Sequence, residues 1–124
     1  MSEIKRVEKA AVFDYDAQSD VLYVYLEGVK YLESVDFGDI ILDIGENNIL
    51  KGIVILDASK KFKVNKYDLK HVQKLSAEIR TTPDIIKLKI TVSILKRNKE
   101  IEKYATARGL NDVSLPTGIV CMEC

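Results

Sequence analysis

The stretch IIKLKITVSILK, residues 85–96, decides the fold class, because its apolar and polar residues alternate one by one. One face collects Ile86, Leu88, Ile90, Val92 and Ile94, and the other collects Lys87, Lys89, Thr91 and Ser93. A strand with one apolar and one polar face is typical of an antiparallel sheet, since the strands of parallel sheets are usually buried on both faces. We therefore expect a mostly antiparallel sheet that covers a core on one side only.

Similar alternation before residue 60 predicts about five further strands. VLYVYLE (21–27) places Leu22, Val24 and Leu26 toward a core and its tyrosines on a second, half-buried face. Turn-forming residues separate the runs, as in DAQSD (16–20) and at Gly38-Asp39. In ILKGIVILDA (49–58), Gly52 marks an expected bulge.

The period changes in NKYDLKHVQKL (65–75), which predicts a short helix capped by Asn65. Alternation then resumes in KLSAEIR (74–80) and IEKYATAR (101–108), which predict further strands. The fold class that follows is α+β, mostly antiparallel β-sheet, with residues 1–124 forming a single domain.

An internal echo predicts a duplication. DVLYVYL from Asp20 is similar to DIIKLKI from Asp84, and KGIVILDAS from Lys51 is similar to TGIVCMEC from Thr117. One interpretation is a pair of β-meander repeats, at 12–60 and 74–123, joined by a linking helix at 65–75. They would superpose strand for strand and share one core, so that the chain is a monomer by internal pseudo-symmetry or a homodimer. The alternative is that two unrelated sets of hairpins share a common pattern.

Composition limits the function classes. Nineteen basic and nineteen acidic residues cancel, which argues against a general phosphate-binding surface but leaves room for a local patch. No apolar run approaches the roughly 18 residues of a membrane span, and the start, MSEIKRVEKA, lacks the apolar region of a signal peptide. We expect a cytoplasmic protein without a membrane partner. Abundant Lys, Glu and Ile favour a thermophile or an AT-rich genome.

Three blocks carry a resemblance to a known family. YDAQSDVLYVYL, VDFGDIILDI and GIVILDASKKF occur in this order between residues 12 and 62, and they resemble the small prokaryotic proteins grouped as domain of unknown function 2283. Residues 63–124 depart from that pattern. The resemblance implies a fold and no established activity. Because small toxin-like genes lie beside some members, the resemblance also implies an antitoxin or partner-binding role by analogy.

Acidic residues near the strand ends are the first candidate site. Asp57 and Ser59 follow a buried strand, where such side chains commonly bond their own backbone and end the strand. In the functional alternative, Asp57 meets Asp43 or Asp16 and grips a cation or a basic side chain of a partner. The candidate partner or ligand site therefore comprises Asp16, Asp20, Asp43, Asp57 and Ser59. An EF-hand counted from Asp14 fails, because Ser19 and Tyr25 occupy the positions that need Gly and Glu.

The remaining motifs point to weaker chemistry. Cys121 and Cys124 form a C-x-x-C that supplies half of a zinc site, so zinc is the alternative to an expected absence of cofactors. His71, the single histidine, lies among lysines and reads as a solvated side chain rather than a catalytic base. The lysines between residues 60 and 74, with Phe62 and Tyr67, form a basic stretch that favours a solvated face over nucleic acid.

No nucleophile–base pair, phosphate-binding glycine loop or complete metal set is recognisable in the sequence, so a non-enzymatic role is favoured. The leading hypothesis is a protein-interaction module with an unknown protein partner, in the manner of an antitoxin. Two alternatives remain: a nucleic-acid accessory protein that uses the 60–74 stretch, and a metal-dependent enzyme built on Asp16, Asp43 and Asp57.

Overall fold

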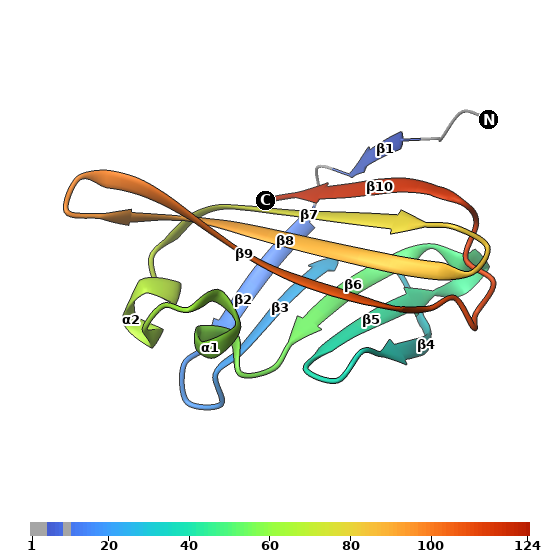
Figure 1. The fold of residues 1–124 in the computed structure, drawn as a ribbon, viewed down its shortest axis with the longest axis horizontal. Helices are drawn as coiled ribbons and strands as arrows, with labels where there is room; N and C mark the ends of the chain where they lie inside the picture. The colour runs from blue at the N-terminus through green and yellow to red at the C-terminus, as the bar shows by residue number, and fades with distance from the viewer. Residues whose placement is uncertain (1–4, 9–10) are drawn as a thin grey trace.

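The computed structural model describes residues 5–8 and 11–124, which form two five-stranded sheets (Figure 1). The first sheet, called sheet B, has the order β2-β3-β6-β5-β4, with neighbours antiparallel throughout. Its strands are β2 (Ala11–Asp16), β3 (Val21–Leu26), β4 (Tyr31–Asp36), β5 (Ile40–Gly45) and β6 (Leu50–Ile55). A 3₁₀ turn, η1 (Glu46–Asn48), joins β5 to β6.

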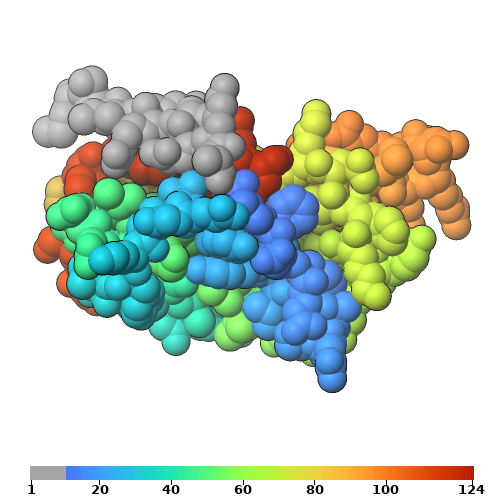
Figure 2. All heavy atoms as spheres, turned by 180° about the vertical axis from the view of Figure 1, so that it is seen from behind, coloured from blue at the N-terminus to red at the C-terminus, as the bar shows by residue number. Residues whose placement is uncertain are grey.

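The second sheet, called sheet A, has the order β1-β10-β7-β8-β9. Only its β1–β10 pair is parallel. Its strands are β1 (Lys5–Glu8), β7 (Val72–Thr81), β8 (Ile85–Lys96), β9 (Lys99–Leu110) and β10 (Gly118–Glu123). The tip of the β8–β9 hairpin projects beyond the rest of the molecule in both views (Figures 1 and 2).

One hydrophobic core lies between the two sheets. It contains Leu22, Val24 and Leu26 of β3 together with Ile86, Leu88 and Ile90 of β8, so these two faces pack in the same core as predicted. Period-two alternation explains the arrangement, since it gives each strand one apolar face that only the other sheet can cover. Ser93 departs from the prediction, because it is buried and donates a hydrogen bond to the Glu100 carboxylate on β9.

The turns follow the sequence closely. Gly38 has a φ of 96°, a left-handed conformation that favours glycine, and it turns β4 into β5. In the pairing of β5 with β6, Asp43 lies opposite Gly52 but the next residue, Ile44, lies opposite Leu50, so Lys51 has no partner on β5. The bulge expected at Gly52 is therefore present.

The prediction of one helix over 65–75 is mostly wrong. Two shorter helices occur instead, α1 (Ala58–Phe62) and α2 (Lys66–Leu69), and β7 already begins at Val72. Asn65 does cap α2, because its side chain accepts a hydrogen bond from the Asp68 amide. The apolar residues at Val72 and Leu75 fitted a helical period, but the alternation from Leu75 onward belongs to the strand.

The second repeat, predicted at 74–123, is not confirmed, because the two halves differ in strand order. In sheet B the last strand, β6, pairs with the second strand, β3; in sheet A the last strand, β10, pairs with β7. The residues expected to superpose also differ: Asp20 is buried and Asp84 is an exposed turn residue, while Gly52 lies inside a strand and Gly118 begins one.

Within the described part of the chain, no helix is long and apolar enough to cross a membrane. Part of the stretch MSEIKRVEKA, from which we expect no signal peptide, lies outside the described residues.

Candidate functional site

Two segments far apart in the sequence meet where the β2–β3 turn touches α1. The Asp20 carboxylate accepts hydrogen bonds from the Tyr15 hydroxyl (2.7 Å) and the Ser59 amide (3.0 Å) at Oδ1, and from the Ser59 hydroxyl (2.6 Å) at Oδ2. Its backbone carbonyl accepts a further bond from the Ala58 amide at 2.9 Å. The Asp20 cluster, namely Tyr15, Asp20 and Ser59, therefore joins β2 to the start of α1.

Burial and hydrogen bonding set the protonation of the Asp20 cluster. Burial alone would raise the pKa of Asp20, but the hydrogen bonds from Ser59 and Tyr15 outweigh it and hold that pKa below its ordinary value. The pKa of Tyr15 is raised well above its ordinary value by burial and by the hydrogen bond to Asp20. Three donors occupy most of the roughly four acceptor positions of an ionised carboxylate, so this cluster stabilises the fold and leaves little capacity for a ligand.

Asp57 and Ser59 have different partners from those predicted. Asp57 is exposed and left-handed (φ 50°), and it precedes α1 without a side-chain capping bond. Its backbone carbonyl, rather than its carboxylate, accepts from the Lys60 and Lys61 amides. Ser59 bonds Asp20 and not its own backbone. The strand ends here because of backbone conformation and the Asp20 cluster.

The five candidate acids and hydroxyls do not form one site. Asp20 and Ser59 are together, but Asp16 bonds within its own turn, where hydrogen bonds from the Ser19 side chain and then the Gln18 amide lower its pKa. Asp43 lies on the outer face of β5. Among the described residues, no group of three or more His, Cys, Asp or Glu side chains is placed to hold a metal ion. Asp16, Asp43 and Asp57 are thus not assembled as the metal-enzyme hypothesis requires.

Asp43 belongs instead to a network on the outer face of sheet B. Tyr23 and Tyr25 stack there, with ring centroids 4.7 Å apart and planes 21° from parallel. Tyr25 donates a hydrogen bond to Asp14 (3.1 Å), and Ser34 donates one to Asp43 (2.8 Å). We call these residues, Asp14, Tyr23, Tyr25, Ser34 and Asp43, the acid–tyrosine face.

The tyrosine hydroxyls are held in their neutral form. Burial, followed by the charge of Asp43 and a hydrogen bond with it, raises the pKa of Tyr23, and the hydrogen bond to Asp14 raises the pKa of Tyr25. Both hydroxyls therefore remain donors to their carboxylates, and the network is organised without any partner.

Gly52 makes room for the tyrosine pair. It lies between Tyr25 and Asp43 in the register of the sheet, and a Cβ at this position would come within 2.5 Å of the Val24 carbonyl and 3.1 Å of Tyr23 Cε1. The bulge signal in the sequence found this glycine, but its packing role depends on neighbouring strands that the sequence alone does not pair.

The acid–tyrosine face carries charge of one sign. Two cross-strand rows traverse all five strands, Asp14–Tyr23–Val54–Ile41–Asp36 and Val12–Tyr25–Gly52–Asp43–Ser34. They contain three aspartates and neither lysine nor arginine. Tyr31, which is 57% exposed on the edge strand β4, extends the network through its hydroxyl to Ser34 (2.8 Å).

The cysteines lie at the end of sheet A. Cys121 is opposite Glu78 in the register of β10 and β7, and the Cys124 amide donates to the Leu75 carbonyl at 2.9 Å. The two cysteines are not joined in a disulfide, and burial raises the pKa of the Cys124 thiol. The expected absence of a cofactor stays a prediction, with zinc held by this pair and shared between two chains as its alternative.

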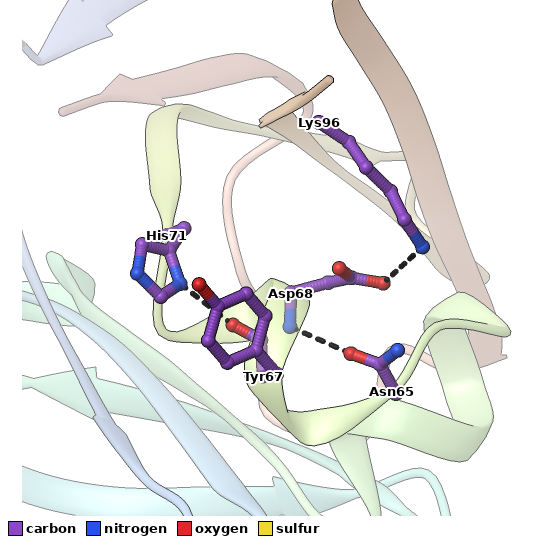
Figure 3. Close-up of polar contacts among 5 residues, drawn as sticks. All are labelled: Asn65, Tyr67, Asp68, His71 and Lys96. Carbon is purple, nitrogen blue, oxygen red and sulfur yellow. Dashed lines mark hydrogen bonds and ion pairs between the residues drawn. The ribbon is translucent and has the colours of Figure 1, made fainter. Parts of the chain in front are cut away.

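The basic stretch at 60–74 is divided by the fold. Phe62 is buried in the core, and Lys61 forms an ion pair with Asp39 at 3.0 Å. His71 is exposed as predicted; its Nδ1 lies 2.8 Å from the Tyr67 carbonyl, and its ring lies against the Tyr67 ring (Figure 3). The loop is held in place by Asp68, which pairs with Lys96 of β8 at 3.4 Å (Figure 3).

Comparison with known proteins gives a family and two relatives. Residues 13–59 match the family described as "Protein of unknown function (DUF2283)". An uncharacterized protein of Methanocaldococcus jannaschii is 45% identical over 108 residues, which cover 86% of this chain and 93% of that protein. A protein of Methanosarcina mazei named "Putative hypoxanthine phosphoribosyltransferase" is 40% identical over 104 residues, or 84% of this chain and 85% of that one. No solved structure matches the chain.

The matched family segment contains both parts of the Asp20 cluster and almost all of sheet B. The two relatives match over most of the chain, so their similarity extends into sheet A as well. The sequence signals found Asp20, Ser59 and Asp43, but they missed Asp14 and Ser34 as members of a site.

Proposed function

Because the chain belongs to the DUF2283 family, whose function is unknown, we propose that it is a protein-interaction module that binds a basic partner on its acid–tyrosine face. One observation carries the proposal: two stacked tyrosines lie on an open sheet face between two carboxylates, Asp14 and Asp43. The chemistry of these side chains favours arginine and lysine, which bond carboxylates and lie over aromatic rings.

The side chains of the acid–tyrosine face are of the kind that bind another protein at low entropic cost. Tyrosines supply a large, rigid contact area at low entropic cost and are enriched where proteins bind each other. Because hydrogen bonds to the carboxylates already hold Tyr23 and Tyr25, little further ordering is needed when a partner arrives. The edge strand β4, with Tyr31 and Leu32 exposed beside the network, enlarges the apolar part of the surface.

A small basic toxin is one partner of the required chemistry, and an antitoxin role would follow if binding covered the toxin's active surface. That identity rests on family analogy, whereas the basic character of the partner rests on the charge of the acid–tyrosine face.

Affinity capture with matched baits tests the proposal. Wild type, Tyr23→Ala/Tyr25→Ala and the control Tyr67→Ala would each be incubated with lysate of the source organism, after circular dichroism has shown that all three are folded. Tyr67 is an exposed tyrosine outside the face, so its loss is a matched change. We expect a basic protein to be retained by wild type and Tyr67→Ala and lost by the double variant. Equal capture by all three baits would contradict the proposal.

The name of the Methanosarcina relative raises the question of a phosphoribosyltransferase role. We expect no such activity in this chain, because the transfer needs a site that closes over a phosphorylated sugar, and the depressions on the described surface of sheet A are open to solvent. Incubation with hypoxanthine and phosphoribosyl pyrophosphate would check this directly; formation of inosine monophosphate above a no-protein blank would show that the name does apply.

A further inference from the structure

The outer face of sheet A carries a row of like charges across three adjacent strands. Arg80 of β7 is directly opposite Lys87 of β8, and Lys87 is directly opposite Arg108 of β9. Lys89 follows two residues after Lys87, on the same face. We call Arg80, Lys87, Lys89 and Arg108 the basic strip; all four are exposed.

This arrangement costs stability in the free protein. Like charges directly opposite each other on neighbouring strands repel, so two of the cross-strand contacts in the strip are unfavourable. An acid of the described chain, Glu78, lies within the strip, where it pairs with Arg80 at 3.5 Å and lies opposite Lys89. Among the described residues of the strip, Lys87, Lys89 and Arg108 outnumber this carboxylate, which gives the strip a local positive charge although the whole chain is neutral. A surface of this kind is complementary to a polyanion.

An aromatic ring lies at one end of the strip. Tyr104 is 63% exposed on β9, and Lys89 Nζ lies 5.1 Å from the centroid of its ring. The strip, Glu78 and Thr106 together line one shallow depression between β7, β8 and β9. A row of cations and an exposed ring beside it are the two elements with which proteins hold an unpaired nucleic-acid strand: the cations bind phosphates and the ring stacks on a base.

We propose that the basic strip binds single-stranded nucleic acid, with its phosphates along the four cations and a base against Tyr104. The alternative polyanion, an acidic protein segment, would use the cations but would not need the ring. The strip lies on the opposite side of the shared core from the acid–tyrosine face, so this site is separate from the proposed protein-binding face and also from the basic stretch at 60–74.

Fluorescence anisotropy with a labelled mixed-sequence 12-nucleotide RNA tests the proposal on the full chain. If all four cations meet phosphates, the affinity should fall about fiftyfold between roughly 50 and 200 mM salt. Lys87→Glu should weaken binding about tenfold. It should also keep or raise the melting temperature, because the new carboxylate lies between Arg80 and Arg108. The matched control is Lys70→Glu, an exposed lysine of the 60–74 stretch, which should bind like wild type.

A third variant separates nucleic acid from an acidic protein segment. Tyr104→Ala should weaken RNA binding about tenfold, while binding of a labelled poly-glutamate peptide of equal charge should be weak and unchanged by it. Absence of RNA binding at low salt, an equal loss in Lys70→Glu, or a poly-glutamate affinity that matches that for RNA would overturn the proposal.

Discussion

Replacing Asp20 with alanine should be among the most damaging single substitutions in the chain. The change removes the acceptor for three donors, the Tyr15 hydroxyl and the amide and hydroxyl of Ser59, which lie partly buried at 2.6 to 3.0 Å. We assign roughly 3 kcal/mol to the stranded donors, since bonds to a charged acceptor are the strong ones and their losses overlap. Asp20 is also left-handed (φ 58°), which costs alanine roughly 1 kcal/mol more. The free energy of unfolding should therefore fall by about 4 kcal/mol.

Asp20→Asn is the matched control. Asparagine tolerates the left-handed backbone, and its Oδ1 still accepts from Tyr15 and the Ser59 amide, so its loss should be about 1 kcal/mol. The pH dependence of the free energy of unfolding separates the role of Asp20 as a hydrogen-bond acceptor from the role of its charge. Because the folded pKa of Asp20 is lowered, its contribution is present above about pH 4 and is lost as the pH falls below that value. Asp20→Asn should lack this part of the acid destabilisation.

Urea unfolding followed by far-ultraviolet circular dichroism measures these differences, which is suitable for a chain without tryptophan. A double-mutant cycle with Tyr15→Phe and Ser59→Ala would show whether the two donors act as one unit. The reasoning fails if Asp20→Ala unfolds within about 1 kcal/mol of wild type, or if Asp20→Asn is as damaging as Asp20→Ala.

Three further substitutions have defined outcomes. Gly52→Ala should cost about 2 kcal/mol in urea unfolding, because its Cβ would meet the Val24 carbonyl; a neutral result would show that the strand can move away. Asp57→Asn should change stability by less than about 0.5 kcal/mol, since Asp57 is exposed and makes no capping bond, and a larger loss would reveal a missing partner. The folded pKa of Tyr15 is raised, so its contribution to the stability of the wild type is full below about pH 10 and is lost as the pH rises further. Tyr15→Phe has no such group and should lose less stability above about pH 10. Melting temperatures that fall in parallel with those of the wild type from about pH 8 to 11 would argue against this.

The sequence predicted the strands of this fold and their local hairpins well, and it predicted the pairing of strands distant in the chain poorly. Alternation in 85–96 identified the buried face of β8, because a period of two follows from the backbone geometry of any strand. Partner choice has no such local signal: nothing in the alternation of β10 says that it pairs with β7 rather than with β8. Because the sequence carries no such signal, it was compatible with two repeats of the same strand order, but the two halves of the structure differ in strand order.

The candidate site was predictable only in part for a similar reason. Asp20 and Ser59 are 39 positions apart, and the family resemblance placed both in matched blocks without indicating that they touch. The acid–tyrosine face needs cross-strand neighbours such as Asp14 and Tyr25, whose relation depends on register rather than on spacing in the chain. The prediction of a helix over 65–75 failed because this segment spans both α2 and the start of β7, and the spacing of its apolar residues fits both periods.

The most direct test of the acid–tyrosine face as a binding surface is an NMR titration of the ¹⁵N-labelled protein with a short arginine- and lysine-rich peptide. We expect saturable shifts at Tyr23, Tyr25, Ser34 and Asp43, and their loss in Asp14→Asn/Asp43→Asn, because those two carboxylates supply the charge that attracts the peptide. Shifts confined to the acids of β9, such as Glu100 and Glu102, or shifts that persist unchanged in the double variant, would contradict the assignment of this face.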